Sequence, residues 1–349
     1  MQDIRTLTLP ELTAAMVTLN EKPFRAKQIY EWLWQKSARS FEEMTNLSKQ
    51  LRTVLQENFA LNAIITDHSQ YSTDGTIKNR FKLHDNFFVE GVLIPTENRT
   101  TACVSSQVGC SLTCKFCATG KLKRERNLTA AEIYDQVAII KHQSETNHER
   151  NLSNIVYMGM GEPLLNYKNV LQSIDRITAA DGLGMSPQRI TVSTAGIAKM
   201  IKQLADDQVK FNLALSLHAA NDEKRNQIMP INESNTLEAL AEALIYFYEK
   251  TRTRVTYEYI VFKNFNDGLA DAQELAAFCR HIPCKVNLIE YNSIGDGEFE
   301  NTAADRLEQF ADYLTQRNII VNIRRSRGKD IDAACGQLAN KGETPTATI

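Results

Sequence analysis

Apolar residues recur with two different periods along this chain, and the change of period divides it into a short helical region and a longer α/β region. In the first 60 residues they follow a helical spacing, for example at Ile29 and Leu33. Thr8 and Ser40 are expected to cap helices of this region, because their hydroxyls can accept from free backbone N–H groups. We therefore expect a compact all-helical unit. Its predicted helices span residues 9–19, 24–35 and 47–59.

A β-hairpin is predicted after the helices. Apolar runs at 80–83 and 87–94 are separated by the polar turn His84–Asn86, which is a hairpin pattern. Glu90 is the one acidic residue inside the second run. Strand alternation by itself would place its side chain on a solvent-facing side.

From residue 101 onward, strand patterns alternate with helical ones. One of the helices, over 129–146, opens with a Thr129-x-x-Glu132 capping box. Alternating βα units predict a parallel sheet with helices outside it, and six units plus a last strand are too few for an eight-stranded barrel. The active site is then expected at the C-terminal ends of the strands. The predicted strands span residues 101–105, 153–158, 188–193, 210–217, 254–262, 284–291 and 319–324.

Composition sets broad limits on the class of protein. The 349 residues suffice for one large domain and a small one, and 43% apolar with 23% charged residues is ordinary for a globular chain. Neither a membrane-length apolar run nor a signal-peptide core is visible, so we expect a cytoplasmic protein. Seven cysteines do not indicate a disulfide framework.

The net charge of −2 excludes a uniformly basic protein that coats RNA. Cationic residues are instead concentrated in two runs beside cysteine motifs. Such patches suit phosphate contacts, although a solvated charged face is the alternative for either run alone. The runs comprise Lys115, Lys121, Lys123, Arg124 and Arg126, and Arg317, Arg324, Arg325, Arg327 and Lys329.

The most specific chemical feature is the loop Gly109–Gly120, which contains Cys110, Cys114 and Cys117 in a C-x3-C-x2-C spacing. Three thiolates can bind three irons of a [4Fe–4S] cluster and leave the fourth iron open to a substrate. The alternative, a zinc knuckle, needs a fourth Cys or His nearby, and only Cys103 lies within twenty residues. The spacing therefore predicts a reactive iron–sulfur cluster.

This loop resembles that of radical S-adenosylmethionine (SAM) enzymes. Further motifs resemble the RlmN-type RNA adenine-C2 methyltransferases in family order: CVSSQVGC at 103–110, CATG at 117–120, GMGEPLLN at 159–166, SLH at 216–218 and DIDAACGQ at 330–337. The resemblance implies an open, partial β/α barrel with a small helical domain and a β-hairpin extension. The implied domains are an RNA-contacting unit at 1–62, a β extension at 63–100 and the catalytic barrel at 101–349.

The same resemblance assigns the cofactor sites. Cys110, Cys114 and Cys117 would hold one [4Fe–4S] cluster, whose open iron chelates the amino and carboxylate groups of SAM. Glu162 would accept from the SAM ammonium. The residues that match SAM-binding positions are Gly161, Glu162, Ser193, Ser216, Leu217, His218 and Asn292.

Adenine C2 is electrophilic, so a direct SN2 transfer from SAM cannot methylate it. The resemblance implies that Cys335 is first methylated and that a 5′-deoxyadenosyl radical from a second SAM then abstracts hydrogen from the S-methyl group. The resulting radical adds to C2. Cys103 matches the cysteine that helps to deprotonate the adduct and releases the RNA by forming a disulfide with Cys335. Glu90 matches a proton acceptor, and Gly91 stands where the family usually has Thr or Ser.

The implied partners are 23S rRNA at the peptidyl-transferase centre, tRNA beside the anticodon, and an electron donor such as flavodoxin or ferredoxin, with a monomeric enzyme. One alternative is the Cfr-type C8 methyltransferase, which shares the cysteine set; GEPLLN at 161–166 favours C2. A more distant alternative is a non-enzymatic iron–sulfur protein that binds RNA or senses redox state. It gives no reason for Cys103, Cys335 and the SAM-like motifs to occur together.

Overall fold

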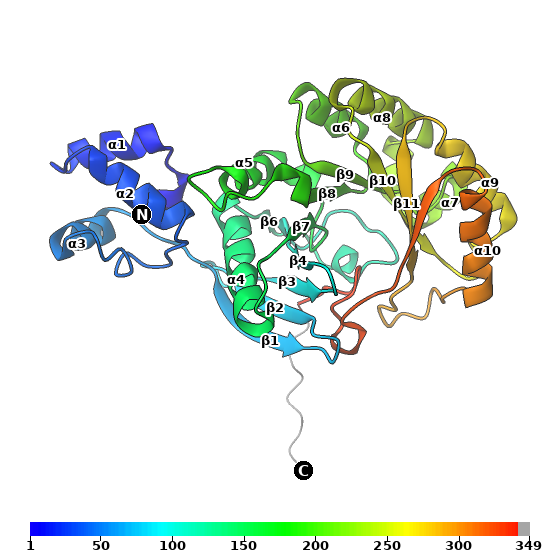
Figure 1. The fold of residues 1–349 in the computed structure, drawn as a ribbon, viewed down its shortest axis with the longest axis horizontal. Helices are drawn as coiled ribbons and strands as arrows, with labels where there is room; N and C mark the ends of the chain where they lie inside the picture. Colours follow the sequence, from blue (N-terminus) through cyan, green and yellow to red (C-terminus); the bar gives the residue numbers. More distant parts are fainter. Residues whose placement is uncertain (341–349) are drawn as a thin grey trace, which may run out of the picture.

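One ten-stranded sheet forms the centre of the molecule in the computed structural model, which describes residues 1–340 (Figure 1). The spatial order is β1-β2-β3-β4-β7-β8-β9-β10-β11-β12. Pairs from β1 to β4 are antiparallel, and all pairs from β4 to β12 are parallel. The strands are β1 (Ile65–Tyr71), β2 (Ile77–Lys82), β3 (Phe88–Pro95), β4 (Thr100–Cys103), β7 (Asn154–Tyr157), β8 (Ile190–Thr194), β9 (Asn212–Ser216), β10 (Val255–Val261), β11 (Cys284–Glu290) and β12 (Ile320–Arg324).

Helices between the parallel strands cover the outer face of the curved sheet (Figure 1). A short two-stranded sheet of β5 (Gln107–Val108) and β6 (Arg126–Asn127) flanks the cysteine loop. In the region described, no helix has both the length and the apolar character needed to cross a membrane. The helices are α1 (Leu9–Thr18), α2 (Phe24–Trp34), α3 (Lys49–Asn58), α4 (Ala130–His148), α5 (Tyr167–Thr178), α6 (Ala198–Asp206), α7 (Asp222–Ile228), α8 (Leu237–Thr251), α9 (Leu269–Phe278) and α10 (Ala304–Thr315).

This architecture confirms the predicted open partial barrel. Each of the seven parallel strands lies where the sequence predicts it, and β1 and β12 form the two edges of the sheet within residues 1–340. The predicted hairpin is β2–β3, with Lys82 opposite Phe88. Strand β1 escaped prediction because it is polar and only partly buried, as is typical of an edge strand.

The N-terminal helices also form as predicted, with one error in capping. Thr8 caps α1 through a capping box with Glu11. Ser48, and not Ser40, caps α3: its hydroxyl accepts from Leu51 N at 3.1 Å. Ser40 lies in the irregular segment before that helix, so α3 begins two residues later than predicted.

Buried ion pairing attaches this helical unit to the barrel. The guanidinium of Arg5 donates to both carboxylate oxygens of Asp135 on α4, at 2.7 and 2.8 Å, and its side chain is only 2% exposed. Arg176 on α5 bonds the hydroxyl of Tyr30 on α2. Helices α4 and α5 therefore carry the N-terminal unit beside the sheet (Figure 1).

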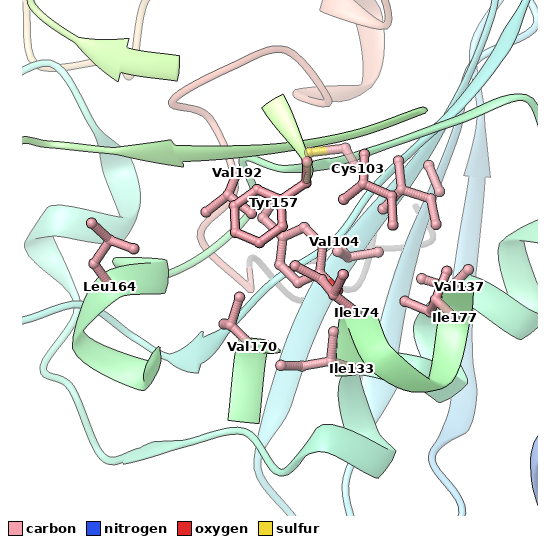
Figure 2. Close-up of a cluster of buried hydrophobic side chains, with 14 of the residues drawn as sticks. Cys103, Val104, Ile133, Val137, Tyr157, Leu164, Val170, Ile174, Ile177 and Val192 are labelled. Carbon is pink, nitrogen blue, oxygen red and sulfur yellow. The ribbon is translucent and has the colours of Figure 1, made fainter. Parts of the chain in front are cut away.

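Apolar packing between these two helices and the sheet fixes the strands that lead into the site. Tyr157 at the end of β7 is 1% exposed, and its hydroxyl bonds Ser173 on α5 at 2.8 Å. Each fully buried large apolar side chain contributes roughly 1.5–3 kcal/mol. Figure 2 shows the cluster, with Cys103 at the end of β4 and the labelled residues Val104, Ile133, Val137, Tyr157, Leu164, Val170, Ile174, Ile177 and Val192.

The segment after β12 spans the opening between the two edges of the sheet (Figure 1). The Asp330 carboxylate accepts from the Ser72 hydroxyl at 2.5 Å in the turn after β1, and Gly328 N donates to Asp74 at 3.0 Å. Further along, Ala339 N donates to Glu90 at 2.9 Å on β3. Residues 326–340, here called the C-terminal strap, thus hold Cys335 against the interior of the barrel.

Candidate active site at the mouth of the partial barrel

A cavity opens at the C-terminal ends of the parallel strands, where the fold predicts the site. Four of the predicted residues lie outside its lining: Glu90, Cys103, Leu217 and Asn292. The predicted residues that line it are Cys110, Cys114, Cys117, Gly161, Glu162, Ser193, Ser216, His218 and Cys335.

The three loop cysteines face this cavity between β5 and a 3-10 turn at Ala118–Lys121. Leu112 N donates to Cys110 Sγ at 3.4 Å, and this hydrogen bond would stabilise the negative charge of a thiolate at Cys110. Burial raises the pKa of Cys110 to about 11 and also raises the pKa values of Cys114 and Cys117. These thiols therefore keep their protons until a metal displaces them.

The arrangement fits a cluster better than a single ion. Among residues 1–340, no three His, Cys, Asp or Glu side chains gather around one point as a mononuclear metal requires. In a [4Fe–4S] cube each thiolate binds a different iron, so three thiols around one cavity need not converge on one point.

The loop after β7 approaches the cavity through its glycines. Gly161 has φ +95°, and a Cβ there would lie 2.5 Å from Gln107 Cβ. Gln107 Oε1 in turn accepts from Glu162 N at 2.8 Å. Only glycine fits this close approach, so the backbone at Glu162 is held next to the cysteine loop.

Glu162 is a buried carboxylate with a defined orientation. Its oxygens accept from Ala195 N at 2.8 Å and Leu164 N at 3.1 Å. Burial raises its pKa, while these hydrogen bonds oppose the shift. Because a carboxylate can accept about four hydrogen bonds, Glu162 retains capacity for a cationic ligand in the cavity.

The strand ends after β8 and β9 add polar groups. The hydroxyls of Ser193 and Ser216 lie 3.3 Å apart. His218 has φ +55°; its Nδ1 accepts from Ile260 N at 3.1 Å, which leaves Nε2 as the donor. Burial lowers the pKa of His218 to about 3, so its imidazole is neutral. Leu217 is fully buried behind the cavity, and its N–H donates to Glu258 O at 3.0 Å.

The side chain of Asn292 indicates whether the site suits a ligand such as SAM. Its amide nitrogen donates to the Cys335 carbonyl at 3.2 Å, but its buried Oδ1 has no hydrogen-bond partner in the described part of the chain. An unpartnered buried acceptor costs roughly 1–3 kcal/mol. A ligand that donates a hydrogen bond, such as the adenine or ribose of SAM, would remove this cost.

Cys103 and Cys335 lie near each other at the inner edge of this site, close enough for the Cys335 sulfur to affect the ionisation of Cys103. Burial, followed by the neighbouring Cys335, raises the pKa of Cys103 to about 12. The sequence placed Arg324 only in a basic run; in the structure it lies near both sulfurs and forms a 3.0 Å ion pair with Glu258. Two features of the sequence could have indicated this ion pair: Arg324 is a charged residue at the end of strand β12, and Glu258 is a charged residue inside the apolar strand β10.

Glu90 projects from the same face of the sheet as Cys103, because Val92 is paired with Cys103 and side chains alternate. It is 2% exposed, so the solvent-facing alternative is wrong. Burial raises its pKa, and Lys78 Nζ, 3.9 Å away, opposes that shift. The neighbouring Gly91 has no room for a side chain, since a Cβ would lie 2.8 Å from the Phe81 ring.

The loop of the first basic run contacts the strap that carries Arg327 and Lys329, but much of the charge of both runs is already paired. Ala118 N donates to Gly336 O at 2.7 Å, so the cysteine loop contacts the C-terminal strap. Arg126 bridges Asp85 and Glu132, which makes it a structural residue. Other paired members of the runs are Lys115 with Glu298, Lys121 with Asp296, Lys123 with Glu125, Arg324 with Glu258, Arg327 with Asp74 and Lys329 with Glu290.

The open barrel and the cysteine loop at its mouth define the class: residues 104–279 match the radical SAM superfamily, and residues 2–61 match the ribosomal RNA large subunit methyltransferase N-terminal domain. A radical SAM methyltransferase from Sphaerobacter thermophilus superposes with a TM-score of 0.92 at 38% identity, over 97% of this chain and 99% of that one.

Two relatives identify the family within this class. A probable dual-specificity RNA methyltransferase RlmN from Cytophaga hutchinsonii is 62% identical over 97% of this chain and 93% of its own length. The dual-specificity RNA methyltransferase RlmN 2 of Myxococcus xanthus is 43% identical over 99% of this chain and 93% of its own length. The chain belongs to the RlmN family, an enzyme family that uses a [4Fe–4S] cluster and SAM.

Proposed function

We propose that this enzyme methylates C2 of adenosine in RNA through a methyl group carried on Cys335. The observation that carries the proposal is the proximity of Cys103 to Cys335, which lines the three-cysteine cavity. Ordinary SAM-dependent transfer needs one nucleophile and no second cysteine. RlmN relatives are dual-specificity RNA methyltransferases by name, which supports two substrates: 23S rRNA at the peptidyl-transferase centre and tRNA next to the anticodon.

The cofactor sites follow from the geometry of the cavity. Cys110, Cys114 and Cys117 would hold the cluster, and Glu162 would receive the SAM ammonium, supported by its fixed carboxylate. When bound, the cluster and SAM together supply the methyl group and the hydrogen-abstracting radical. The remaining SAM contacts are assigned to Gly161, Ser193, Ser216, Leu217, His218 and Asn292, with Leu217 acting through its backbone only.

The chain's own residues then divide three tasks. Cys335, on the C-terminal strap, carries the one-carbon unit to the base. Glu90 accepts the proton that must leave C2, and its raised pKa makes it a better base than an exposed carboxylate. Burial keeps Cys103 protonated until a late step. Once deprotonated, it attacks Cys335 Sγ and forms a disulfide; the bond from Cys335 Sγ to the RNA-bound carbon breaks, and that carbon takes the electron pair and then a proton to become the methyl group.

Arg324 is the added positioning residue in this scheme. Its guanidinium lies close to both sulfurs and is held by Glu258, so it stabilises whichever of them becomes a thiolate.

The wider organisation is proposed in the same terms. Residues 1–62 form an RNA-contacting unit, 63–100 a β extension and 101–349 the catalytic domain. The enzyme acts as a monomer in the cytoplasm, where reducing conditions keep its thiols available, and takes electrons from flavodoxin or ferredoxin. We assign Arg124 and Arg325 to RNA phosphate contacts, since both are exposed and neither forms an ion pair within residues 1–340, together with Lys123, whose 3.7 Å ion pair with Glu125 is at the surface.

A cysteine replacement tests the two-cysteine scheme. Cys103→Ala should leave RNA covalently trapped on Cys335, visible as a slow band on a denaturing gel that nuclease removes. Cys335→Ala, the matched control, should trap nothing. Mass spectrometry of RNA methylated by the unaltered enzyme distinguishes C2 from C8. Normal turnover by Cys103→Ala without a trapped species would refute the resolving role of Cys103, and 8-methyladenosine would refute the C2 assignment.

A further inference from the structure

A second cavity lies at the opposite end of the barrel, where β10, β11 and β12 begin. Two cysteines outside the active site line it. Cys279 ends helix α9, and Cys284 is the first residue of β11, with a four-residue connection between them. Strand β11 has seven residues, so roughly 20 Å separate this cavity from the catalytic end of the barrel.

The two cysteines are in contact. Cys284 Sγ donates to the Cys279 carbonyl at 3.7 Å, and the two thiols lie close enough for each to affect the ionisation of the other. Their exposure differs: Cys279 is 7% exposed, whereas Cys284 is half-buried and lines the open cavity. Cys284 is therefore the more accessible of the two residues, and Cys279 lies beside it in the lining of the same cavity.

The surroundings favour a thiolate. The hydroxyl of Tyr257 on β10 is fully buried, lies close enough to both sulfurs for them to affect its ionisation, and has no hydrogen-bond partner among residues 1–340. A buried hydroxyl without a hydrogen-bond partner is costly, and a thiolate would remove this cost by accepting a hydrogen bond from it. Arg254, at the mouth of the cavity, also favours the ionised form of Cys284.

The charge of the cavity indicates which reagents it attracts. Arg254, Arg280 and Arg317 line it, and no Asp or Glu is part of its lining. Arg317 donates to the Tyr313 carbonyl at 2.9 Å, and no ion pair is found for any of the three in the described region. Three unpaired guanidinium groups around an accessible thiol favour an anionic reagent.

We propose that Cys279 and Cys284 form a redox-active dithiol that reacts with anionic disulfides of low molecular weight. The Cys284 thiolate attacks one sulfur of the disulfide, which forms a mixed disulfide and releases one thiolate. Cys279 then gives up its proton and attacks Cys284 Sγ, so that an internal disulfide forms and the second thiol leaves. Two thiols are oxidised and one disulfide is reduced to two thiols, so the electrons balance.

This chemistry is independent of the methylation mechanism. The cysteines of the proposed catalytic pair, Cys103 and Cys335, lie at the other end of the barrel, and the cavity at the barrel base contains neither. Cys279 and Cys284 belong to none of the motifs that resemble the RlmN family. Their mutual contact depends on the end of α9 meeting the start of β11, which no local sequence pattern specifies.

Peptide mapping provides a direct test. The cluster-loaded full-length enzyme is treated anaerobically with oxidised glutathione and digested with trypsin without reduction. Trypsin cleaves after Arg280, between the two cysteines, so an internal disulfide joins peptides 264–280 and 281–285. We expect this linked species in the unaltered enzyme. Cys279→Ser should instead retain one glutathione on Cys284, and Cys284→Ser should react slowly at Cys279.

The charge argument has a separate measurement. Oxidised glutathione should react about tenfold faster than cationic cystamine at low salt, and the ratio should fall in 0.5 M salt or in Arg254→Gln. Absence of the linked peptides in the unaltered enzyme, or equal reactivity of Cys279→Ser and Cys284→Ser, would overturn the dithiol. Equal rates for the two reagents would overturn the preference for anions.

Discussion

Replacing Arg225 with Met should destabilise the protein and loosen the SAM cavity. Arg225 on α7 is completely buried and has no carboxylate in direct contact with its guanidinium in the described structure. It donates to the carbonyls of Leu217 at 3.0 Å, Ser216 at 3.2 Å and Ala195 at 2.5 Å, and to Asn232 Oδ1 at 2.6 Å. One side chain thus joins the loops that follow β8 and β9.

The magnitude follows from two opposing terms. Methionine fills similar space but donates nothing, so four buried acceptors lose a donor at about 1–3 kcal/mol each. Removing the charge recovers several kcal/mol, because burial penalises the guanidinium and lowers its pKa to about 10. The acceptors relax in part, so the balance of these two terms gives an expected net loss of about 3–5 kcal/mol.

Urea unfolding of cluster-free protein measures the loss, with Arg189→Met as the matched control. Arg189 is exposed and has no side-chain hydrogen bond or ion pair in the described region, so its replacement should change stability by less than about 0.5 kcal/mol. A change below 1 kcal/mol for Arg225→Met would show that its hydrogen bonds do not hold the loops together. SAM binding to cluster-loaded protein should weaken in parallel.

Two further predictions concern the loop after β7 and the buried carboxylate on β3. Gly161→Ala should cost more than about 2 kcal/mol and weaken SAM binding, because φ is +95° and the new Cβ meets Gln107; Gly184→Ala, with positive φ but open space, should cost only about 1 kcal/mol by urea unfolding. Glu90→Gln should become more stable relative to the unaltered protein as pH rises from 4 to 7. Burial raises the pKa of Glu90 in the folded state, so its ionisation weakens folding above the unfolded value near 4.5, and an opposite pH trend would contradict this assignment.

Local patterns predicted most of the fold. Central parallel strands such as β8 and β10 are buried on both faces and read as short apolar runs, so their positions were visible in the sequence. Strand β1 was not, because an edge strand tolerates polar residues on both faces. The choice of Ser48 over Ser40 as a cap also depends on tertiary contacts, since both serines precede plausible helical sequence.

The candidate site also contains some residues that local sequence patterns predict and others that depend on contacts between distant parts of the chain. Cys110, Cys114 and Cys117 lie on one loop, so their spacing alone indicated a cluster. Arg225 and Arg324 act through carbonyls, thiols and carboxylates that are distant in the sequence, and no local pattern specifies those contacts. For the same reason, the basic runs showed where charge lies but not which charges were already paired.

The interior polarity of this barrel argues that the site, and not stability, determined its composition. A purely structural β/α barrel fills its interior with branched apolar side chains. Here Glu90, Glu162, Arg225 and Glu258 are each at most 4% exposed, although every buried charge costs several kcal/mol before its hydrogen bonds are counted. Backbone donors, carbonyls or Arg324 stabilise each of them, so the cost is reduced but not removed. Apolar replacements of similar size are available at each position, and they would eliminate the groups that we propose to orient SAM and the two cysteines and to act as the base.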